Sequence, residues 1–131
     1  MRILRIQSGL GLTELMRKLD GLDAVALREG IASSKEEFEL ADHLAKSAFS
    51  KKTNIARQLR YEFLLWISGK TDIKSAMAET SPEKNEFFVV VFSDAKPDAV
   101  CRMLEAKELP LRLNKNAEAL AIERISLSRI M

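Results

Sequence analysis

Apolar and polar residues alternate along parts of the chain with the period of a β-strand. Positions 2–7 predict a first strand that contains a short apolar run. Positions 24–29 alternate Val25 and Leu27 with Ala26 and Arg28, as a half-buried strand does. Positions 87–92 form a continuous run of valine and phenylalanine, which favours a fully buried strand. Alternating leucines at 109–113 predict a further strand. The pattern therefore predicts a sheet of about four strands.

Other segments repeat their apolar residues at spacings of three and four, which indicates amphipathic helices. The predicted helices cover 13–19, 34–49, 55–67, 72–78, 97–107 and 116–131. Ser34 and Glu37 have the spacing of a capping box, which fixes one helix start. The 55–67 helix has a stripe of Ile55, Phe63 and Trp66 and further apolar residues outside it, so we expect it to be central. Only Arg57 and Arg60 are expected to reach water from it.

These elements predict an α/β protein of the α+β type, with a mixed sheet of about four strands packed with helices. The length of 131 residues and the hydrophobic fraction of 47% suit a single domain over 1–131 with a helical half. A lone cysteine, Cys101, makes no intramolecular disulfide and is typical of a reducing compartment. The first apolar run is short and contains Arg2, unlike a signal peptide, and no run reaches a membrane-spanning length. We expect a cytoplasmic protein with no membrane partner.

The residues that usually carry catalysis or bind cofactors are few. His43 is the only histidine and falls on the polar face of its helix, while Cys101 has the setting of a small core residue. Gly9 and Gly11 lack the third glycine of a dinucleotide site, and the Gly-Lys-Thr of 69–71 follows a helix instead of a strand. We therefore expect no metal, no cofactor, no small-molecule substrate and no catalytic residue.

Glu62 lies at the edge of the apolar stripe of its helix, so its carboxylate should be partly buried. Such a group needs hydrogen bonds or a cation. We expect it to cap a neighbouring helix or loop. A catalytic role would require a second acid or base nearby, and the sequence indicates none.

Positive charge is concentrated in one part of the chain. The net charge is only +2, but positions 46–74 hold seven lysines and arginines against two acidic residues. Clustered cations of this kind can follow nucleic-acid phosphates. The candidate RNA contacts are Lys51, Lys52, Arg57, Arg60 and Lys70.

The last predicted helix is apolar on nearly every side, which is more than a small domain can cover. One flank of it should meet a partner protein. We assign that flank to Ile122, Ile125 and Ile130, separate from a second flank of Leu120, Leu127 and Met131. Glu123, Arg124 and Arg129 would supply the polar rim of the interface.

A family resemblance joins these features. The stretch Glu62-Phe63-Leu64-Leu65-Trp66-Ile67-Ser68-Gly69, followed by Ile73 and Ala76, resembles the PRPK-binding (TPRKB, Cgi) subunit of the KEOPS complex, archaeal type. That family has a glutamate, two leucines, an aromatic residue and then Leu-Ser-Gly. Where it has Arg-Gln before the isoleucine, this chain has Thr71-Asp72.

The resemblance implies a non-catalytic role in the threonylcarbamoyladenosine modification of tRNA. A subunit of that family binds the kinase/ATPase subunit of KEOPS and holds the 3′ CCA end of tRNA, while another chain is catalytic. Two alternatives remain open from the residues alone. One is a small acyltransferase-like enzyme using Cys101 or Glu62, and the other is a purely structural adaptor whose basic segment is only solvated.

Overall fold

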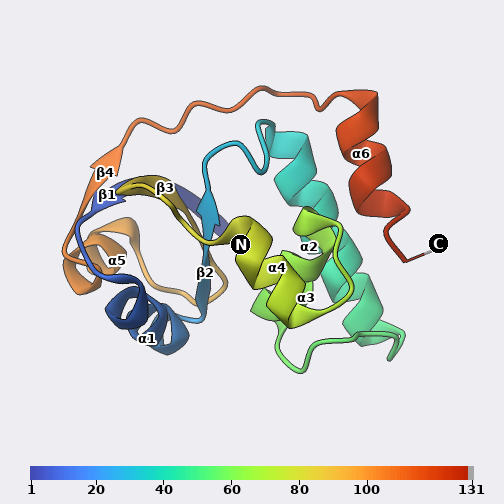
Figure 1. Cartoon of the computed structure of the whole chain (residues 1–131), viewed down its shortest axis with the longest axis horizontal. Coiled ribbons are helices and arrows are strands. Elements are labelled where there is room, and N and C mark those ends of the chain that lie inside the picture. Colours follow the sequence, from blue (N-terminus) through green and yellow to red (C-terminus); the bar gives the residue numbers. More distant parts are fainter. Residues whose placement is uncertain (130–131) are drawn as a thin grey trace. The chain divides into compact units, whose positions relative to one another are not determined.

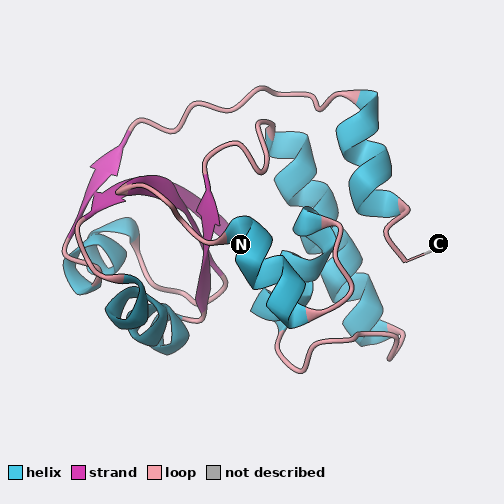
Figure 2. Cartoon of the chain, in the orientation of Figure 1, coloured by secondary structure: helices cyan, strands magenta, loops and turns pink. Residues whose placement is uncertain are grey.

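The computed structural model describes residues 1–129, which form six helices and one four-stranded sheet (Figures 1 and 2). The chain divides into two compact units. The sheet unit consists of Met1–Glu29 and Ser81–Arg112, and the helical unit of Gly30–Thr80 and Leu113–Met131. The predicted α+β class, the four strands and the helical half are confirmed.

The sheet is built from β1 (Arg2–Ser8), β2 (Ala24–Arg28), β3 (Glu86–Val91) and β4 (Ala106–Leu109), in the order β2-β3-β1-β4. Every neighbouring pair is antiparallel, so the expected mixed sheet is wrong. The helix-linked strands β1 and β2 do run in the same direction. They are not neighbours, because β3 lies between them and pairs with both.

One face of the sheet carries the core of its unit, under α1 (Leu12–Leu22) and α5 (Pro97–Met103) (Figure 1). Alternate strand residues point to these helices, as the period of two predicts. The main members of this core are Leu4, Ile6, Leu15, Leu19, Leu22, Ala24, Ala26, Phe87, Val89, Val91, Val100 and Leu104.

The last strand begins three residues earlier than predicted, and α5 ends four residues earlier. Glu105 takes a left-handed backbone conformation, with φ of 50°. Its amide donates to the Arg102 carbonyl at 3.3 Å, so the chain turns directly after Leu104. The alternating leucines at 109–113 therefore extend past the strand, which stops at Leu109.

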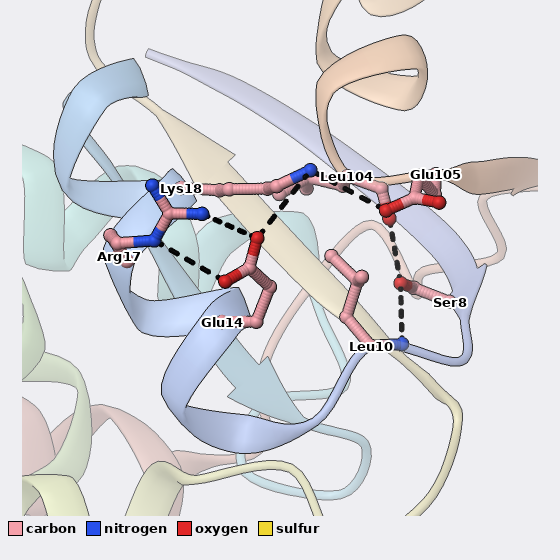
Figure 3. A network of polar contacts seen from close by, with 7 residues as sticks. All are labelled: Ser8, Leu10, Glu14, Arg17, Lys18, Leu104 and Glu105. Carbon is pink, nitrogen blue, oxygen red and sulfur yellow. Dashed lines mark hydrogen bonds and ion pairs between the residues drawn. The ribbon is translucent and has the colours of Figure 1, made fainter.

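Polar contacts tie this turn to the rest of the sheet unit (Figure 3). The Ser8 hydroxyl donates to the Leu104 carbonyl at 2.8 Å, in a buried position. Lys18 of α1 lies 3.5 Å from the Glu105 carboxylate and 3.9 Å from that of Glu14. The end of β1 at Ser8 and the residue that follows α5 are thereby joined by a buried hydrogen bond.

The helical unit contains α2 (Lys35–Ser50), α3 (Leu59–Ser68), α4 (Ile73–Thr80) and α6 (Ala119–Ser126). The capping box predicted for α2 is confirmed, because Ser34 Oγ accepts from the Glu37 amide while Glu37 Oε2 accepts from the Ser34 amide. Helix α3 is buried from Glu62 to Ser68, as its apolar faces predict. Phe38 and Phe63 stack between α2 and α3 with ring centroids 6.5 Å apart.

Helix α6 packs against both α2 and α3 (Figure 1). It spans eight residues, fewer than predicted for this segment. Ile130 and Met131 lie outside the described residues. Across positions 1–129, no helix combines the length and the apolar character that crossing a membrane requires.

Gly69 ends α3 in the left-handed region, with φ of 71°. The amides of Gly69 and Lys70 donate to the Trp66 and Leu65 carbonyls, which is the Schellman arrangement. A Cβ at this position would also lie 3.0 Å from Arg124 Cγ. Gly69 therefore ends the helix and admits α6 closely.

Gly69→Ala should destabilise the protein by about 1–2 kcal/mol, because alanine disfavours this φ and its Cβ meets Arg124. Gly21→Ala is the matched control, since Gly21 lies within α1 and has open space around its Cβ position. That change should stabilise by about 0.5–1 kcal/mol. Urea denaturation of the two variants measures both shifts, and equal shifts of one sign would contradict this account of Gly69.

Candidate nucleic-acid interface

The segment between α2 and α3 carries three exposed cations, Lys51, Lys52 and Arg57, together with the 49% exposed Ile55. We call residues 51–58 the basic loop. The prediction that helix begins at Ile55 is wrong, because α3 begins at Leu59 (Figure 2). The prediction that Ile55 belongs to the buried stripe is wrong for the same reason. The amides of residues 51–53 donate to carbonyls of α2, but the amides further along the loop need other partners.

Glu62 of α3 supplies those partners from inside the helical unit. Its side chain is completely buried, and Oε1 accepts from the amides of Ile55 and Ala56, each at 2.9 Å. Its other oxygen, Oε2, accepts from the Trp66 indole nitrogen at 3.1 Å. The expectation that Glu62 caps a neighbouring loop is confirmed, and the burial is more complete than predicted.

Arg129, just beyond α6, provides the positive charge for this carboxylate. Its Nη1 lies 2.6 Å from Glu62 Oε2, and its guanidinium carbon lies 4.1 Å from the centre of the Trp66 ring. The contact is an ion pair: within the described chain, none of the guanidinium nitrogens makes an aligned hydrogen bond. The Trp66 ring therefore fixes the plane of the arginine while Glu62 neutralises it.

A second pair of the same kind anchors the other side of α6. Glu37 of α2 is buried, and its Oε1 lies 3.5 Å from Nη2 of Arg124. The same Nη2 donates to the carbonyl of Ile31 at 3.1 Å and to that of Ile67 at 3.4 Å. The predicted placement of Arg129 on the rim of an interface is therefore wrong, because its side chain is largely buried. Arg124 also holds α6 to its own unit, but its side chain stays 42% exposed.

Sequence reasoning missed these two roles, although a signal for them was present. Glu37 and Glu62 both fall on the first turns of their helices, directly before Phe38 and Phe63, where a carboxylate that is buried needs a cation. Arg124 and Arg129 are the arginines of the final segment, where the hydrophobic residues alone drew attention. Matching the buried acids to these cations would have predicted that the two glutamates pair with the two arginines. It would not have shown which arginine pairs with which glutamate.

The prediction that Arg60 reaches water is wrong. The residue is only 3% exposed, its Nε donates to the Gln58 side chain at 2.8 Å, and its guanidinium lies over the Tyr61 ring at 4.3 Å. The delayed start of α3 causes the difference. With Arg60 in the first turn of the helix, its side chain folds back onto the end of the basic loop and is not available at the surface.

Lys52 adopts a backbone conformation that glycine usually provides. Its φ is 59°, and the amides of Lys52 and Thr53 donate to the Phe49 and Ala48 carbonyls. This is the same Schellman arrangement that Gly69 forms at the end of α3. A lysine there costs about 1 kcal/mol relative to glycine. Lys51, one residue earlier, has an ordinary right-handed conformation with φ of −87°.

Lys70 lies apart from the other exposed cations of the predicted site. It follows α3, whereas Arg57 precedes it, and ten helical residues span about 15 Å. Lys70 instead lines an open groove of about 700 Å³ between the α3–α4 turn and α6. Asp72, on the same wall, accepts from the Ser75 amide, and this hydrogen bond lowers the pKa of its carboxyl.

The far wall of this groove is the exposed face of α6. Leu120 is 77% exposed and Leu127 is 43% exposed, and both line the groove. The predicted partner flank is wrong at Ile125, which is fully buried in the helical unit, and Ile122 is half-buried. Ile130, the third member, lies outside the described residues. Among the described residues the exposed flank is the leucine one, because Leu120 and Leu127 are exposed while Ile125 is buried.

The residues considered for catalysis have ordinary structural surroundings. His43 is exposed on α2, as predicted, and Cys101 packs at the border of the sheet-unit core. Burial raises the pKa of the Cys101 thiol, and the carboxylates of Glu108 and Asp98 raise it further. Within residues 1–129, no group of three potential metal ligands is arranged to hold an ion. Comparison with known protein families and with curated proteins gives no match to this chain.

Lys52→Gly should stabilise the protein by about 0.5–1 kcal/mol, because glycine adopts the left-handed conformation without strain. Lys51→Gly removes the same charge one residue earlier, where no strain is relieved, and should destabilise by up to about 1 kcal/mol. Thermal or urea unfolding of the pair provides the measurement. Loss of stability in both variants would mean that the Lys52 side chain itself supports the fold.

Proposed function

We propose that this chain is a non-catalytic accessory subunit that binds the 3′ CCA end of tRNA and a kinase/ATPase subunit. This is the role implied by its resemblance to the PRPK-binding (TPRKB, Cgi) subunit of KEOPS, which supports threonylcarbamoyladenosine modification. One observation carries the proposal. Glu62 and Trp66, two residues of the resembling motif, together build the support of the loop that exposes Lys51, Lys52 and Arg57.

A loop held in this way suits a nucleic-acid phosphate backbone. The cations of a flexible loop lose conformational entropy when they bind, whereas the backbone of this loop is already fixed at Ile55 and Ala56 by a buried carboxylate. The exposed Ile55 side chain beside Arg57 adds an apolar surface of the kind that packs against a ribose or base. The proposed contacts are therefore Lys51, Lys52 and Arg57, without the buried Arg60.

The strain at Lys52 supports a binding role for this loop. A glycine would be more stable at the position, so stability alone does not account for a lysine there. The lysine does lie at the negative end of the α2 dipole, which offsets part of the cost. The remaining cost is understandable if the side chain binds an anion such as a phosphate.

The surroundings of Glu62 and Cys101 favour an accessory role over an acyltransferase. Both oxygens of Glu62 are engaged by two amides, an indole and an arginine, so no oxygen is left for a substrate proton. The raised pKa of the Cys101 thiol lowers its thiolate fraction at neutral pH, which is the opposite of what a nucleophile needs.

The kinase partner is proposed to bind the leucine face of α6. Leu120 and Leu127 are seven residues apart, two turns along one side of the helix, and remain exposed while Ile125 anchors the opposite side. Exposed leucines at this spacing beside Lys70 and Glu123 have the apolar centre and charged border of a protein interface. They replace the isoleucine flank that the sequence suggested.

The RNA site is tested with the triple variant Lys51→Gln, Lys52→Gln and Arg57→Gln. Its affinity for intact tRNA should fall, and the slope of log affinity against log salt should decrease by about 2, at about 0.7 for each lost phosphate contact. Filter binding over a salt series gives both quantities. Removing CCA from the tRNA should abolish the difference between the variant and the wild-type protein.

Lys35→Gln with Lys115→Gln is the matched control. Lys35 is exposed at the opposite end of α2, about 24 Å from Lys51, and Lys115 adjoins the bridge between Asn114 and Ser34. This double variant should retain the wild-type slope. A triple variant that binds intact tRNA with the wild-type affinity and slope would exclude the basic loop as the site.

The partner face is tested with Leu120→Arg and Leu127→Arg. Both side chains are exposed, so stability should change by no more than about 0.5 kcal/mol, while co-purification with the kinase subunit should be lost. Leu12→Arg is the control, because Leu12 is a 52% exposed leucine in the sheet unit, between Leu120 and Leu127 in exposure. If both α6 variants still co-purify with the kinase, it binds elsewhere.

A further inference from the structure

The Glu62 carboxylate joins two parts of the helical unit that are far apart in sequence. One oxygen holds the basic loop through the Ile55 and Ala56 amides, and the other lies against Trp66 and Arg129. Arg129 follows α6 in the second segment of this unit, whereas the basic loop lies between α2 and α3 in the first. The segment after α6 and the basic loop therefore share a single side chain.

The geometry on the Arg129 side is restrictive. The Trp66 ring lies against the guanidinium face, and the same indole donates its N–H to Glu62 Oε2. Trp66 thus contacts both charges of the pair and sets their mutual orientation. The Arg129 side chain is largely buried, so water replaces it poorly as a partner of the carboxylate.

Loss of the Arg129 charge would leave a completely buried carboxylate with neutral donors alone among the described contacts. Such a charge draws water toward itself or moves toward solvent. Either change competes with the two amide hydrogen bonds, because both of these end on the same carboxylate. The loop amides are the weaker side of this arrangement, since five of the first seven loop side chains, including that of Ile55, are exposed to solvent.

We infer that Arg129 is a positioning residue for RNA binding, which holds Glu62 so that Glu62 fixes the basic loop in its binding conformation. This inference rests on the proposed function of the loop. Arg129 does not itself contact RNA in this arrangement. Its removal should therefore weaken binding by loosening the loop, and not by removing a phosphate contact.

Hydrogen exchange and salt-dependent tRNA binding of Arg129→Gln test the inference together. The Ile55 and Ala56 amides should exchange at least about tenfold faster, because their acceptor is released. Affinity for intact tRNA should fall by about three- to tenfold, the cost of ordering one or two side chains again. The slope of affinity against salt should stay at the wild-type value, unlike in the triple variant.

Arg124→Gln is the matched control. It removes the partner of the other buried glutamate, Glu37, which holds no part of the basic loop. It should leave the exchange of Ile55 and Ala56 and the tRNA affinity unchanged, even if α6 packs less well. Arg129→Lys keeps the charge and should restore most of the protection and affinity.

Four results would overturn the inference. These are unchanged exchange at Ile55 and Ala56, equally accelerated exchange throughout α2 and α3, faster exchange with wild-type affinity, and a reduced salt slope. Failure of the proposed function gives a different result, because the wild-type protein itself would then not bind intact tRNA. In that case the exchange rates alone decide whether Arg129 fixes the loop.

Discussion

The Glu62 carboxylate is fully buried, and a buried negative charge is stable only where hydrogen bonds and a cation replace the water it has lost. That requirement organises much of the helical unit. It recruits the Ile55 and Ala56 amides, which lie before the start of α3. It also recruits Trp66 and Arg129, which holds Arg129, beyond the end of α6, against α3. Removing one member of such a pair typically costs about 3–5 kcal/mol, so the arrangement is strongly specified.

The two capped helix ends of this unit show how stability and a binding role can differ. Gly69 and Lys52 occupy equivalent positions in two Schellman arrangements with similar positive φ values. Gly69 is the residue type that adopts this left-handed conformation most easily, and the absence of a Cβ leaves room for Arg124. At Lys52 the backbone preference is overridden, and the side chain is exposed beside Lys51. The phosphate-binding surface that we propose for this loop is a reason for keeping such a residue.

Part of the candidate site was predictable from residue types alone. Lys51, Lys52 and Arg57 are exposed as their charge suggests, and Glu62 caps a loop as a carboxylate on an apolar helix should. Arg60 was misplaced because α3 begins at Leu59 instead of Ile55, and Ile125 because the sequence does not show which flank of α6 is covered. Helical periodicity places Leu120 and Ile125 on different flanks of α6. Because both flanks are apolar, it does not show which of them is buried. Packing against α2 and α3 decided that Ile125 faces inward while Leu120 faces water.

The sequence by itself determined the α+β class, the four strands, the capping box of α2 and the central position of α3, because each follows from local period or local hydrogen bonding. Tertiary structure alone decided the antiparallel order β2-β3-β1-β4, since strand pairing depends on which strands become neighbours in the folded sheet. It also decided that Glu37 pairs with Arg124 and Glu62 with Arg129. A buried charge specifies that it needs a partner, but only the folded chain brings a particular arginine within reach.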